Sequence, residues 1–314
     1  MAARPKAVVF AYHNVGVRCL LTLLARDIDV DLVVTHRDNP SETIWFASVH
    51  DTAIEHDIPT VFAEDLDAVA LQAKVAGLAP DFLFSFYFRN MLPAAILSLP
   101  KKGAYNMHGS LLPKYRGRVP INWAIIHGET ETGATLHEMA LKPDAGAIIA
   151  QTSVPILPDD TAREVFVKVT VAAEQTLWRA LPDLIDGHPF RIPNELSKGS
   201  YFGGRKAEDG RIDWHASAVA IHNLVRAVAP PYPGATTIID GLPITIARTR
   251  LSREVVSGSR ADDPAILVQG DRCLACCGDG RWLEILAASI DGQPLDGAAL
   301  AARLGDGPHL AGSV

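Results

Sequence analysis

The sequence contains few cysteines, and their spacing gives no sign of a metal centre. Cys19 stands alone, and Cys273, Cys276 and Cys277 share the stretch CLACC. The CxxC in that stretch is followed by no second pair at zinc-ligand spacing and has no histidine cluster near it. We interpret the cysteines as small apolar side chains of a protein in a reducing compartment, and we expect no metal ion.

Long apolar runs are also lacking. No stretch approaches the roughly 18 consecutive apolar residues that a membrane-spanning helix needs. Only a short apolar run precedes His13, which does not fit a signal peptide. These absences predict a soluble, cytoplasmic protein with no membrane partner.

Positive charge is not in excess. The formal net charge is −7 at pH 7, and acidic residues outnumber basic ones on both sides of Gly204. Because Lys and Arg contacts to phosphates dominate nucleic-acid binding, this balance disfavours a nucleic-acid partner. The sequence also has no GxGxxG fingerprint, so we expect no NAD.

The first half of the chain, in contrast, carries a strong alternation of strand-like and helix-like patterns. Continuous apolar runs such as AVVFAY and DFLFSFY are typical of strands that are covered on both faces of a parallel sheet. The patterns predict strands at 7–12, 30–35, 60–63, 81–87 and 103–108, and helices at 15–25, 43–56 and 66–78. Such an order predicts a Rossmann-like α/β domain with a parallel sheet.

The pattern changes in the second half. Two strands at 133–140 and 147–156 are joined by a turn at 141–146, and a helix is expected at 161–181. A stretch rich in Gly, Pro and polar residues follows, and then come a short helix at 221–230 and several short β-like runs between glycines. We therefore predict three parts: an α/β domain at 1–186, a linker at 187–203, and a smaller β-barrel-like (OB-like) domain at 204–314 whose tail frays after Pro294.

A polar pair, Asn106 and His108, ends the strand at 103–108. Residues two apart on a strand share a face, and ligands of parallel sheets bind beyond the carboxyl ends of the strands. Taken singly, His108 could be a structural histidine, Asn106 a turn cap and Asp144 an Asx-turn residue. The position of the pair nevertheless predicts chemistry at this edge of the sheet.

The ordered set of motifs around this pair resembles a known family. The segments are NMHGSLLPKYRGR (106–118) and KPDAGAIIAQ (142–151), which are similar to the core of the formyltransferases that use 10-formyltetrahydrofolate. The resemblance covers about Lys6 to Arg250. It implies that Asn106 donates to the oxyanion, that His108 carries the proton, and that Asp144 faces His108, favours its protonated form and orients its ring. It further implies a 10-formyltetrahydrofolate site at Asn90, Met91, Leu92, Ser110, Arg118, Ala140, Leu141, Lys142, Pro143 and Asp144.

The acceptor amine is less clearly specified. The segments VVFAYHNVG, FSFYFRNML and WHASAVAIHNLVRAVAPPYPGA resemble UDP-4-amino-4-deoxy-L-arabinose formyltransferase, the amino-terminal half of the bifunctional ArnA. This resemblance implies a UDP-amino sugar substrate, lipid A modification and polymyxin resistance. It leaves open another nucleotide-linked amino sugar, a separate decarboxylase partner and a homo-oligomer. The acidic charge and the lack of a Gly-Thr-Pro turn after the first strand disfavour methionyl-tRNA formyltransferase, although it shares the two-domain plan.

Four further residues are candidates for binding the acceptor. Tyr12 and His13 end the first strand, at the ligand edge of the sheet, and Arg205 and Arg226 are cations suited to phosphate. His127 and His137 are interpreted as structural. A folate-binding module without catalysis is the alternative from a different class, and the intact set of Asn106, His108 and Asp144 argues against it. A formyltetrahydrofolate hydrolase, in which water replaces the amine, also remains open.

Overall fold

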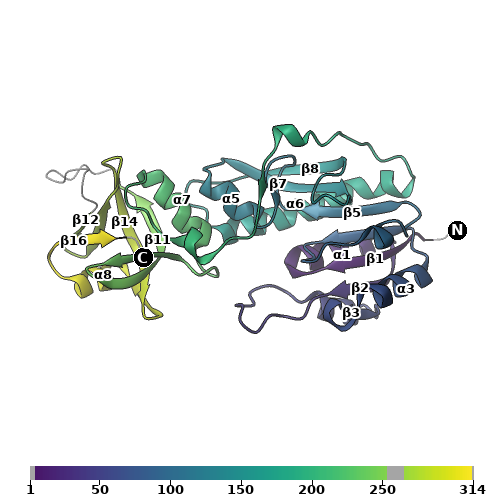
Figure 1. Ribbon diagram of the computed structural model, residues 1–314, viewed down its shortest axis with the longest axis horizontal. Coiled ribbons are helices and arrows are strands. Elements are labelled where there is room, and N and C mark those ends of the chain that lie inside the picture. The colour runs from purple at the N-terminus through teal and green to yellow at the C-terminus, as the bar shows by residue number, and fades with distance from the viewer. Residues whose placement is uncertain (1–3, 253–264, 313–314) are drawn as a thin grey trace. The chain divides into compact units, whose positions relative to one another are not determined.

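The computed structural model describes residues 4–252 and 265–312, which form two compact units (Figure 1). The described residues of Met1–Pro120, Glu131–Val154 and Val167–Gly203 belong to the first unit. The second unit takes its residues from Ile121–Thr130, Pro155–Phe166 and Gly204–Val314. Each unit has its own seven-stranded sheet.

The sheet of the first unit has the strand order β3-β2-β1-β4-β5-β7-β8. Its strands are β1 (Lys6–Ala11), β2 (Asp29–Thr35), β3 (Thr60–Phe62), β4 (Phe82–Phe86), β5 (Gly103–His108), β7 (Glu131–Glu138) and β8 (Ile148–Pro155). The first five are parallel, as predicted, and β7 runs antiparallel to β5. The strand order reverses between β1 and β4, which is where open α/β sheets bind their ligands.

Helices of this unit follow the predicted pattern with one exception. They are α1 (His13–Ala25), α2 (Val49–Glu55), α3 (Ala68–Leu78), α4 (Ala94–Leu97) and α6 (Ala162–Ile185), whose first turn is assigned to the second unit. The helix predicted at 43–56 is wrong in its first half, because α2 begins only after Ser48, whose side chain accepts from the Asp51 amide. Residues 37–48 are irregular because tertiary contacts hold them: Phe46 stacks on His13 at 3.8 Å, and the Ala47 amide donates to Asn14.

The second unit is built on a closed barrel, which confirms the predicted β-rich domain. Six strands form the ring, because β11 pairs with both β10 and β14. They are β10 (Ala235–Ile239), β11 (Leu242–Leu251), β12 (Ala265–Gln269), β13 (Arg272–Cys276), β14 (Trp282–Ile290) and β16 (Gly307–Gly312), with β15 (Gln293–Asp296) paired on the outer side of β14. Helices α5 (Pro120–Ile126) and α7 (Ala218–Val228) precede the barrel in the chain.

The predicted fraying after Pro294 is wrong for the residues that the structure describes. Asp296 caps α8 (Gly297–Leu304), and Leu300 and Ala301 are buried in the barrel core. Strand β16 then fills the gap between β10 and β12. The barrel cannot close without this segment, so its many small residues are ordered by pairing rather than by their own propensity.

Two further predictions concern the cysteines and the linker. All four cysteines are buried and free, which confirms that they serve as core side chains. Residues 187–203 do not form a loose connection, because β9 (Tyr201–Phe202) pairs with β6 (Arg116–Gly117) and Ile192 bridges to Ile148.

Short 3-10 turns lie at Ala63–Asp65, Leu196–Lys198 and Ala207–Gly210.

A membrane span is not found among the described helices, none of which combines the necessary length and apolar character.

Candidate active site

Four polar side chains meet beside the end of β5. Asn106 and His108 share one face of that strand, and Asp144 reaches them from the turn between β7 and β8. His137 lies directly opposite Asn106 in the β5–β7 pair, and cross-strand partners share a face. Asp144 Oδ1 lies 3.4 Å from Asn106 Nδ2, 3.5 Å from His108 Nδ1 and 3.4 Å from His137 Nε2. We call these four residues the polar cluster.

Asp144 is held by two neighbours, Gly117 and Asn194. The Gly117 amide donates to its Oδ2 at 2.8 Å, and Asn194 Nδ2 donates to the carbonyls of Asp144 and Gly146 at 3.0 and 3.1 Å. The backbone of Asp144 is left-handed, with φ of 48°, a conformation that Asp tolerates better than most residues. Its carboxylate is therefore fixed in place rather than free to rotate into solvent.

The charge state of Asp144 follows from these neighbours. Burial opposes ionisation of the carboxyl group, but the charge of His108, the contact with His137 and the Gly117 hydrogen bond outweigh it. The pKa of Asp144 is consequently held well below its ordinary value. Asp144 is a permanent carboxylate at neutral pH.

The two histidines of the polar cluster are oriented by backbone carbonyls. His108 Nε2 lies 2.8 Å from the Tyr115 oxygen, and His137 Nδ1 lies 2.7 Å from the Glu138 oxygen. A carbonyl only accepts, so each of these nitrogens carries a hydrogen. Both ring nitrogens of His108 face acceptor oxygens, so a proton on either one finds a partner.

Asn106 has its amide nitrogen at the centre of the polar cluster. Nδ2 lies 3.1 Å from His137 Nε2 and 3.4 Å from Asp144 Oδ1. The same ring nitrogen of His137 thus lies beside both the Asn106 amide and the Asp144 carboxylate. The cluster thus combines an amide donor, a histidine that can exchange a proton and a fixed carboxylate, which are the groups that acyl-type transfer requires.

The residues expected to hold the co-substrate fall into two groups. Ser110 and Leu92 are buried: the Ser110 hydroxyl donates to the Lys114 carbonyl at 2.7 Å, and Leu92 packs in the apolar core of the sheet. Asn90, Met91, Arg118, Leu141 and Lys142 are exposed, while Ala140 and Pro143 are half-buried. Met91 and Leu141 are large apolar side chains with 58% and 69% exposure, which leaves them available to a planar ligand.

Tyr12 and His13 lie at the end of β1, where β1 and β4 diverge. The Tyr12 hydroxyl donates to Asp38 at 2.7 Å, and burial together with that bond raises its pKa. Burial and then the charge of Arg89 lower the pKa of His13 to about 3, so this ring is neutral and stacks on Phe46. Both side chains are thus engaged with the 37–48 segment, which Arg89 also anchors through two hydrogen bonds to Glu42.

The two cations expected to hold phosphate, Arg205 and Arg226, belong to the second unit. Arg226 is buried, and its guanidinium donates to Asn223 Oδ1 and to the Asp160 carbonyl, both at 2.9 Å. Arg205 is half-buried, donates to the Asp209 carbonyl at 2.7 Å and lies 5.8 Å above the ring of Trp123. Burial lowers the pKa of both guanidinium groups.

Several groups of the site were not predicted from the sequence. His137 was interpreted as structural, although it contacts both Asn106 and Asp144. The Gly117 amide, the Tyr115 carbonyl and Asn194 were not singled out. Alternation along β7 places His137 on the same face as Gly133 and Thr135, and Gly133 lies next to Leu111. Only the β5–β7 register shows that this face is the one that carries Asn106.

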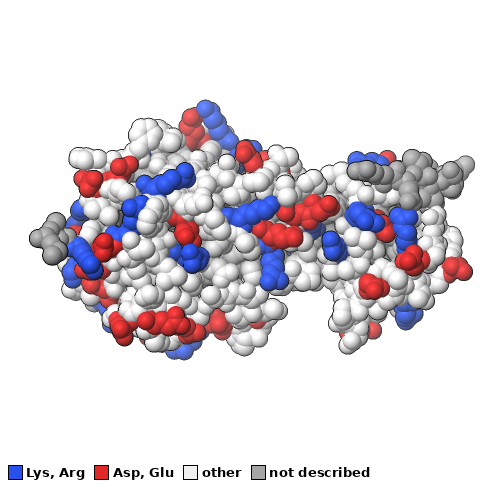
Figure 2. Space-filling model, turned by 180° about the vertical axis from the view of Figure 1, so that it is seen from behind, with Lys and Arg blue, Asp and Glu red and all other residues white. Residues whose placement is uncertain are grey.

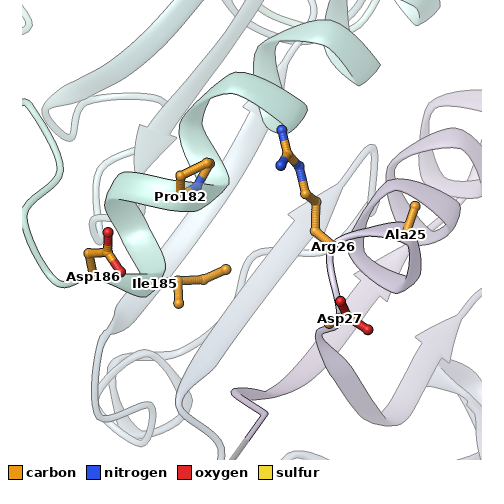
Figure 3. Close-up of a pocket in the computed structure, with 6 residues that line it drawn as sticks. All are labelled: Ala25, Arg26, Asp27, Pro182, Ile185 and Asp186. Atoms are coloured by element: carbon orange, nitrogen blue, oxygen red, sulfur yellow. The ribbon is translucent and has the colours of Figure 1, made fainter. Parts of the chain in front are cut away.

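A separate pocket of about 280 Å³ lies between the ends of α1 and α6 (Figure 3). Its lining residues are Ala25, Arg26, Asp27, Pro182, Ile185 and Asp186. Arg26 already donates to the Trp178 carbonyl at 3.0 Å and stacks 3.5 Å from the centre of the Trp178 ring. Because its cation is engaged and it includes none of the polar cluster, we place the candidate site at the cluster instead.

On the face shown in Figure 2, basic and acidic side chains are interspersed. Within residues 4–252 and 265–312, no group of three or more His, Cys, Asp or Glu side chains is arranged to hold a metal ion.

Comparison with known families gives two matches that together span most of the chain. The formyl transferase family model matches residues 18–181, and the model of the formyl transferase C-terminal domain matches residues 205–304. The first match includes the entire polar cluster. The second covers α7, strands β10 to β15 and all of α8, and it ends before the barrel strand β16.

Solved structures with the same fold include three sugar-modifying or N-formylating enzymes. The N-formyltransferase from Helicobacter canadensis, in complex with folinic acid and dTDP-3-aminofucose, has a TM-score of 0.70 at 20% identity, over 90% of this chain and 99% of its own. WlaRD, a sugar 3N-formyl transferase studied with dTDP and 5-N-formyl-THF, gives 0.69 at 21%, over 93% and 100%. A 4-N formyltransferase from Francisella tularensis gives 0.61 at 21%, over 74% and 91%. At these identities the likeness establishes the fold.

Proposed function

The chain belongs to the formyltransferase family, and we propose that it transfers the formyl group of 10-formyltetrahydrofolate to the 4-amino group of UDP-4-amino-4-deoxy-L-arabinose. The observation that carries this proposal is the convergence of Asn106, His108 and Asp144 at the end of β5. The proposal assigns the chain to lipid A modification and so to resistance against cationic peptides such as polymyxin.

The reaction requires one bond to form and one to break. The amine nitrogen bonds to the formyl carbon, the bond from that carbon to N10 of the folate breaks, and one proton passes from the amine to N10. Between these events the formyl oxygen carries negative charge. The protein must therefore supply a donor for this oxygen and a carrier for the proton.

Asn106 and His108 fill these two roles. The Asn106 amide donates to the oxygen as charge develops, and losing one such donor typically costs about 3 kcal/mol of barrier. His108 accepts the amine proton and returns it to the leaving nitrogen, because histidine is the side chain that titrates near neutral pH. Asp144 stabilises the imidazolium that forms, and its contact of 3.5 Å with His108 leaves room to tighten when substrates bind.

The folate is proposed to lie along the loops that follow β4 and β7. Exposed Met91 and Leu141 offer apolar surface to its rings, and exposed Arg118 offers a cation to its carboxylates. Ser110 is proposed to shape the loop rather than touch the folate, since its hydroxyl is bound within that loop. Two of the structurally similar enzymes are described with a folate, folinic acid in one and 5-N-formyl-THF in the other.

A second acceptor is supported by the same comparisons. The structures from Helicobacter canadensis and of WlaRD are described with a dTDP-amino sugar and with dTDP, not with a UDP-arabinose derivative. A dTDP-linked 3- or 4-amino sugar is therefore the alternative acceptor, and the mechanism is the same for it. Both candidates share a nucleoside diphosphate on a sugar that carries an amine.

The proposal is tested by a formyl-transfer assay with 10-formyltetrahydrofolate and a panel of acceptors. The panel contains UDP-4-amino-4-deoxy-L-arabinose, dTDP-linked 3- and 4-amino sugars, and charged initiator tRNA. We expect turnover with the UDP sugar at the highest kcat/KM. Preference for a dTDP sugar would replace the acceptor and keep the mechanism, whereas turnover of tRNA alone would overturn the nucleotide-sugar proposal.

A further inference from the structure

Arg116 is a buried cation whose hydrogen bonds are incomplete. Its side chain lies on β6 with only 7% exposure, and neither Nε nor Nη1 has a hydrogen-bond partner. Within the described residues no carboxylate lies within ion-pair distance of it, and the ring of Tyr201 is centred 5.8 Å from its guanidinium carbon. Buried charges are normally paired, because an unpaired one is strongly destabilising.

Arg226 shows how the same chain treats an arginine with a structural role. It has the same 7% exposure, but its guanidinium donates to Asn223 Oδ1, to the Asp160 carbonyl and to the Leu157 carbonyl. Those oxygens satisfy the buried donors within the protein. The donors of Arg116 are left over, which indicates a partner that comes from outside the chain.

The backbone of Arg116 is fixed next to the polar cluster. On one side of it the Tyr115 carbonyl contacts His108 at 2.8 Å, and on the other side the Gly117 amide contacts Asp144 at 2.8 Å. The Arg116 amide itself donates to the Ser200 carbonyl at 3.0 Å, which clamps the segment to β9. Arg116 is therefore in the same short segment as the backbone groups that contact His108 and Asp144.

Only one substrate of the proposed reaction carries an anion close to its reacting atom. The carboxylates of the folate lie beyond its aminobenzoyl ring, far along the molecule from the formyl group. The diphosphate of a nucleotide-linked amino sugar is joined to the same sugar ring that bears the amine. A guanidinium also matches phosphate oxygens with paired hydrogen bonds.

We propose that Arg116 binds the diphosphate of the nucleotide-sugar acceptor and so positions the amine at His108. This assignment rests on the proposed function, because it presupposes a nucleoside-diphosphate acceptor. It separates the two arginines that flank Gly117: Arg116 serves the acceptor, and exposed Arg118 serves the folate. If Arg116 instead held the fold, its replacement would lower Tm, whereas the proposed binding role leaves Tm unchanged.

The test compares Arg116→Met and Arg116→Lys with the wild type and with Arg226→Met. Calorimetric titration with UDP, with dTDP and with folinic acid gives the affinities, and thermal unfolding gives Tm. We expect Arg116→Met to lower the affinity for the nucleotide that the wild type binds by about 10- to 100-fold, which is the range for the loss of hydrogen bonds to charged groups. Folinic acid affinity and Tm are expected to stay at wild-type values, and Arg116→Lys to recover part of the affinity. Arg226→Met is expected to lower Tm.

Each other outcome overturns the assignment. Failure of Arg116→Met to fold, or a fall in Tm like that of Arg226→Met, would make Arg116 structural. Weakened folinic acid binding would assign it to the co-substrate. Unchanged nucleotide affinity, with the wild type still formylating a nucleotide sugar, would remove this inference alone. If the wild type binds folinic acid but neither nucleotide, the proposed acceptor class falls together with it.

Discussion

Each unit contains a histidine between a backbone carbonyl and a carboxylate. The two sites differ in the distance from the histidine to the carboxylate. In the barrel, His309 lies 3.0 Å from the Gly305 carbonyl and 2.6 Å from Asp240. At the end of β5, His108 lies 2.8 Å from the Tyr115 carbonyl but 3.5 Å from Asp144. The carbonyl contacts are alike, and the carboxylate contacts are not.

Oδ1 of the carboxylate in the polar cluster faces three side chains, whereas Asp240 in the barrel contacts one side chain, that of His309, and the backbone amide of Leu310. Asp144 Oδ1 is within 3.4–3.5 Å of Asn106, His108 and His137, each longer than an ordinary hydrogen bond. Glu284 of the barrel also makes short ion pairs, with Arg272 at 3.0 Å and with Arg250 at 2.6 Å. Short contacts of this kind serve the fold, while the long contacts of Asp144 leave capacity for a substrate, as apo active sites commonly do.

The largest expected effect comes from removing His108, with removal of His309 as the comparison. His108→Ala is expected to lower kcat by about 10²- to 10⁴-fold, the usual contribution of general acid–base catalysis, with Tm near that of the wild type. The assay is formyl transfer at saturating acceptor, with circular dichroism to check the fold. His309→Ala is the matched control, expected to lower Tm and keep kcat. Substantial turnover by His108→Ala would contradict its role as proton carrier.

Disturbing the strand that supports Asp144 is expected to affect both stability and activity. Gly117 has φ of 98°, and a Cβ placed there would lie 2.1 Å from the Phe202 carbonyl. Gly117→Ala must separate β6 from β9, at a cost of about 1–3 kcal/mol in the free energy of unfolding. It should also lower kcat, because the Gly117 amide orients Asp144.

Gly77→Ala provides the control for that substitution. Gly77 lies in α3, and a Cβ there meets nothing within 4 Å. Alanine is favoured over glycine in a helix by about 0.5–1 kcal/mol, so this variant should be slightly more stable and fully active. Chemical denaturation measures both variants, and equal stability of the two would show that the β6–β9 contact is not restrictive.

His137 is expected to contribute a smaller amount. His137→Phe removes the ring nitrogen that contacts Asn106 while keeping a ring in the strand. The loss of about one net hydrogen bond, ~1 kcal/mol, corresponds to a fall of about fivefold in kcat. KM for the acceptor should stay unchanged, because the effect is on the orientation of Asn106. A wild-type kcat in steady-state assays would return His137 to a purely structural role.

The smallest expected effect is the pH dependence of the barrel. Burial opposes the charged form of His309, but the hydrogen bond to Asp240 outweighs it and raises its pKa. A raised folded pKa gives stability that is fully present below the ordinary histidine value, about 6.5, and is lost as pH rises through the folded value. The Tm difference between wild type and His309→Gln should therefore be a few degrees at pH 6 and shrink as pH rises. A difference that grows above pH 7 would contradict this ion pair.

Local sequence patterns were sufficient to predict those strands of the first unit that are buried along almost their whole length. Strands β1 and β4 are buried along their length, so continuous apolar runs identified them. The pattern failed at 37–48, where Trp45 and Phe46 pack on His13 instead of extending a helix. It failed again after Pro294, where small residues are ordered by the pairing of β16 with β10 and β12.

The sequence by itself determined the α/β order, the separate β-rich domain and the pair Asn106 and His108, because periodicity and spacing are local properties. Only the tertiary structure decided that His137 faces Asn106 and that Asp144 and the amide of Gly117 meet. Those contacts depend on strand register, and a shift of one residue would turn His137 to the other face of the sheet. The tertiary structure also decided that Arg226 is satisfied within the chain while Arg116 is not, because two buried arginines in a sequence are alike until their neighbours are known.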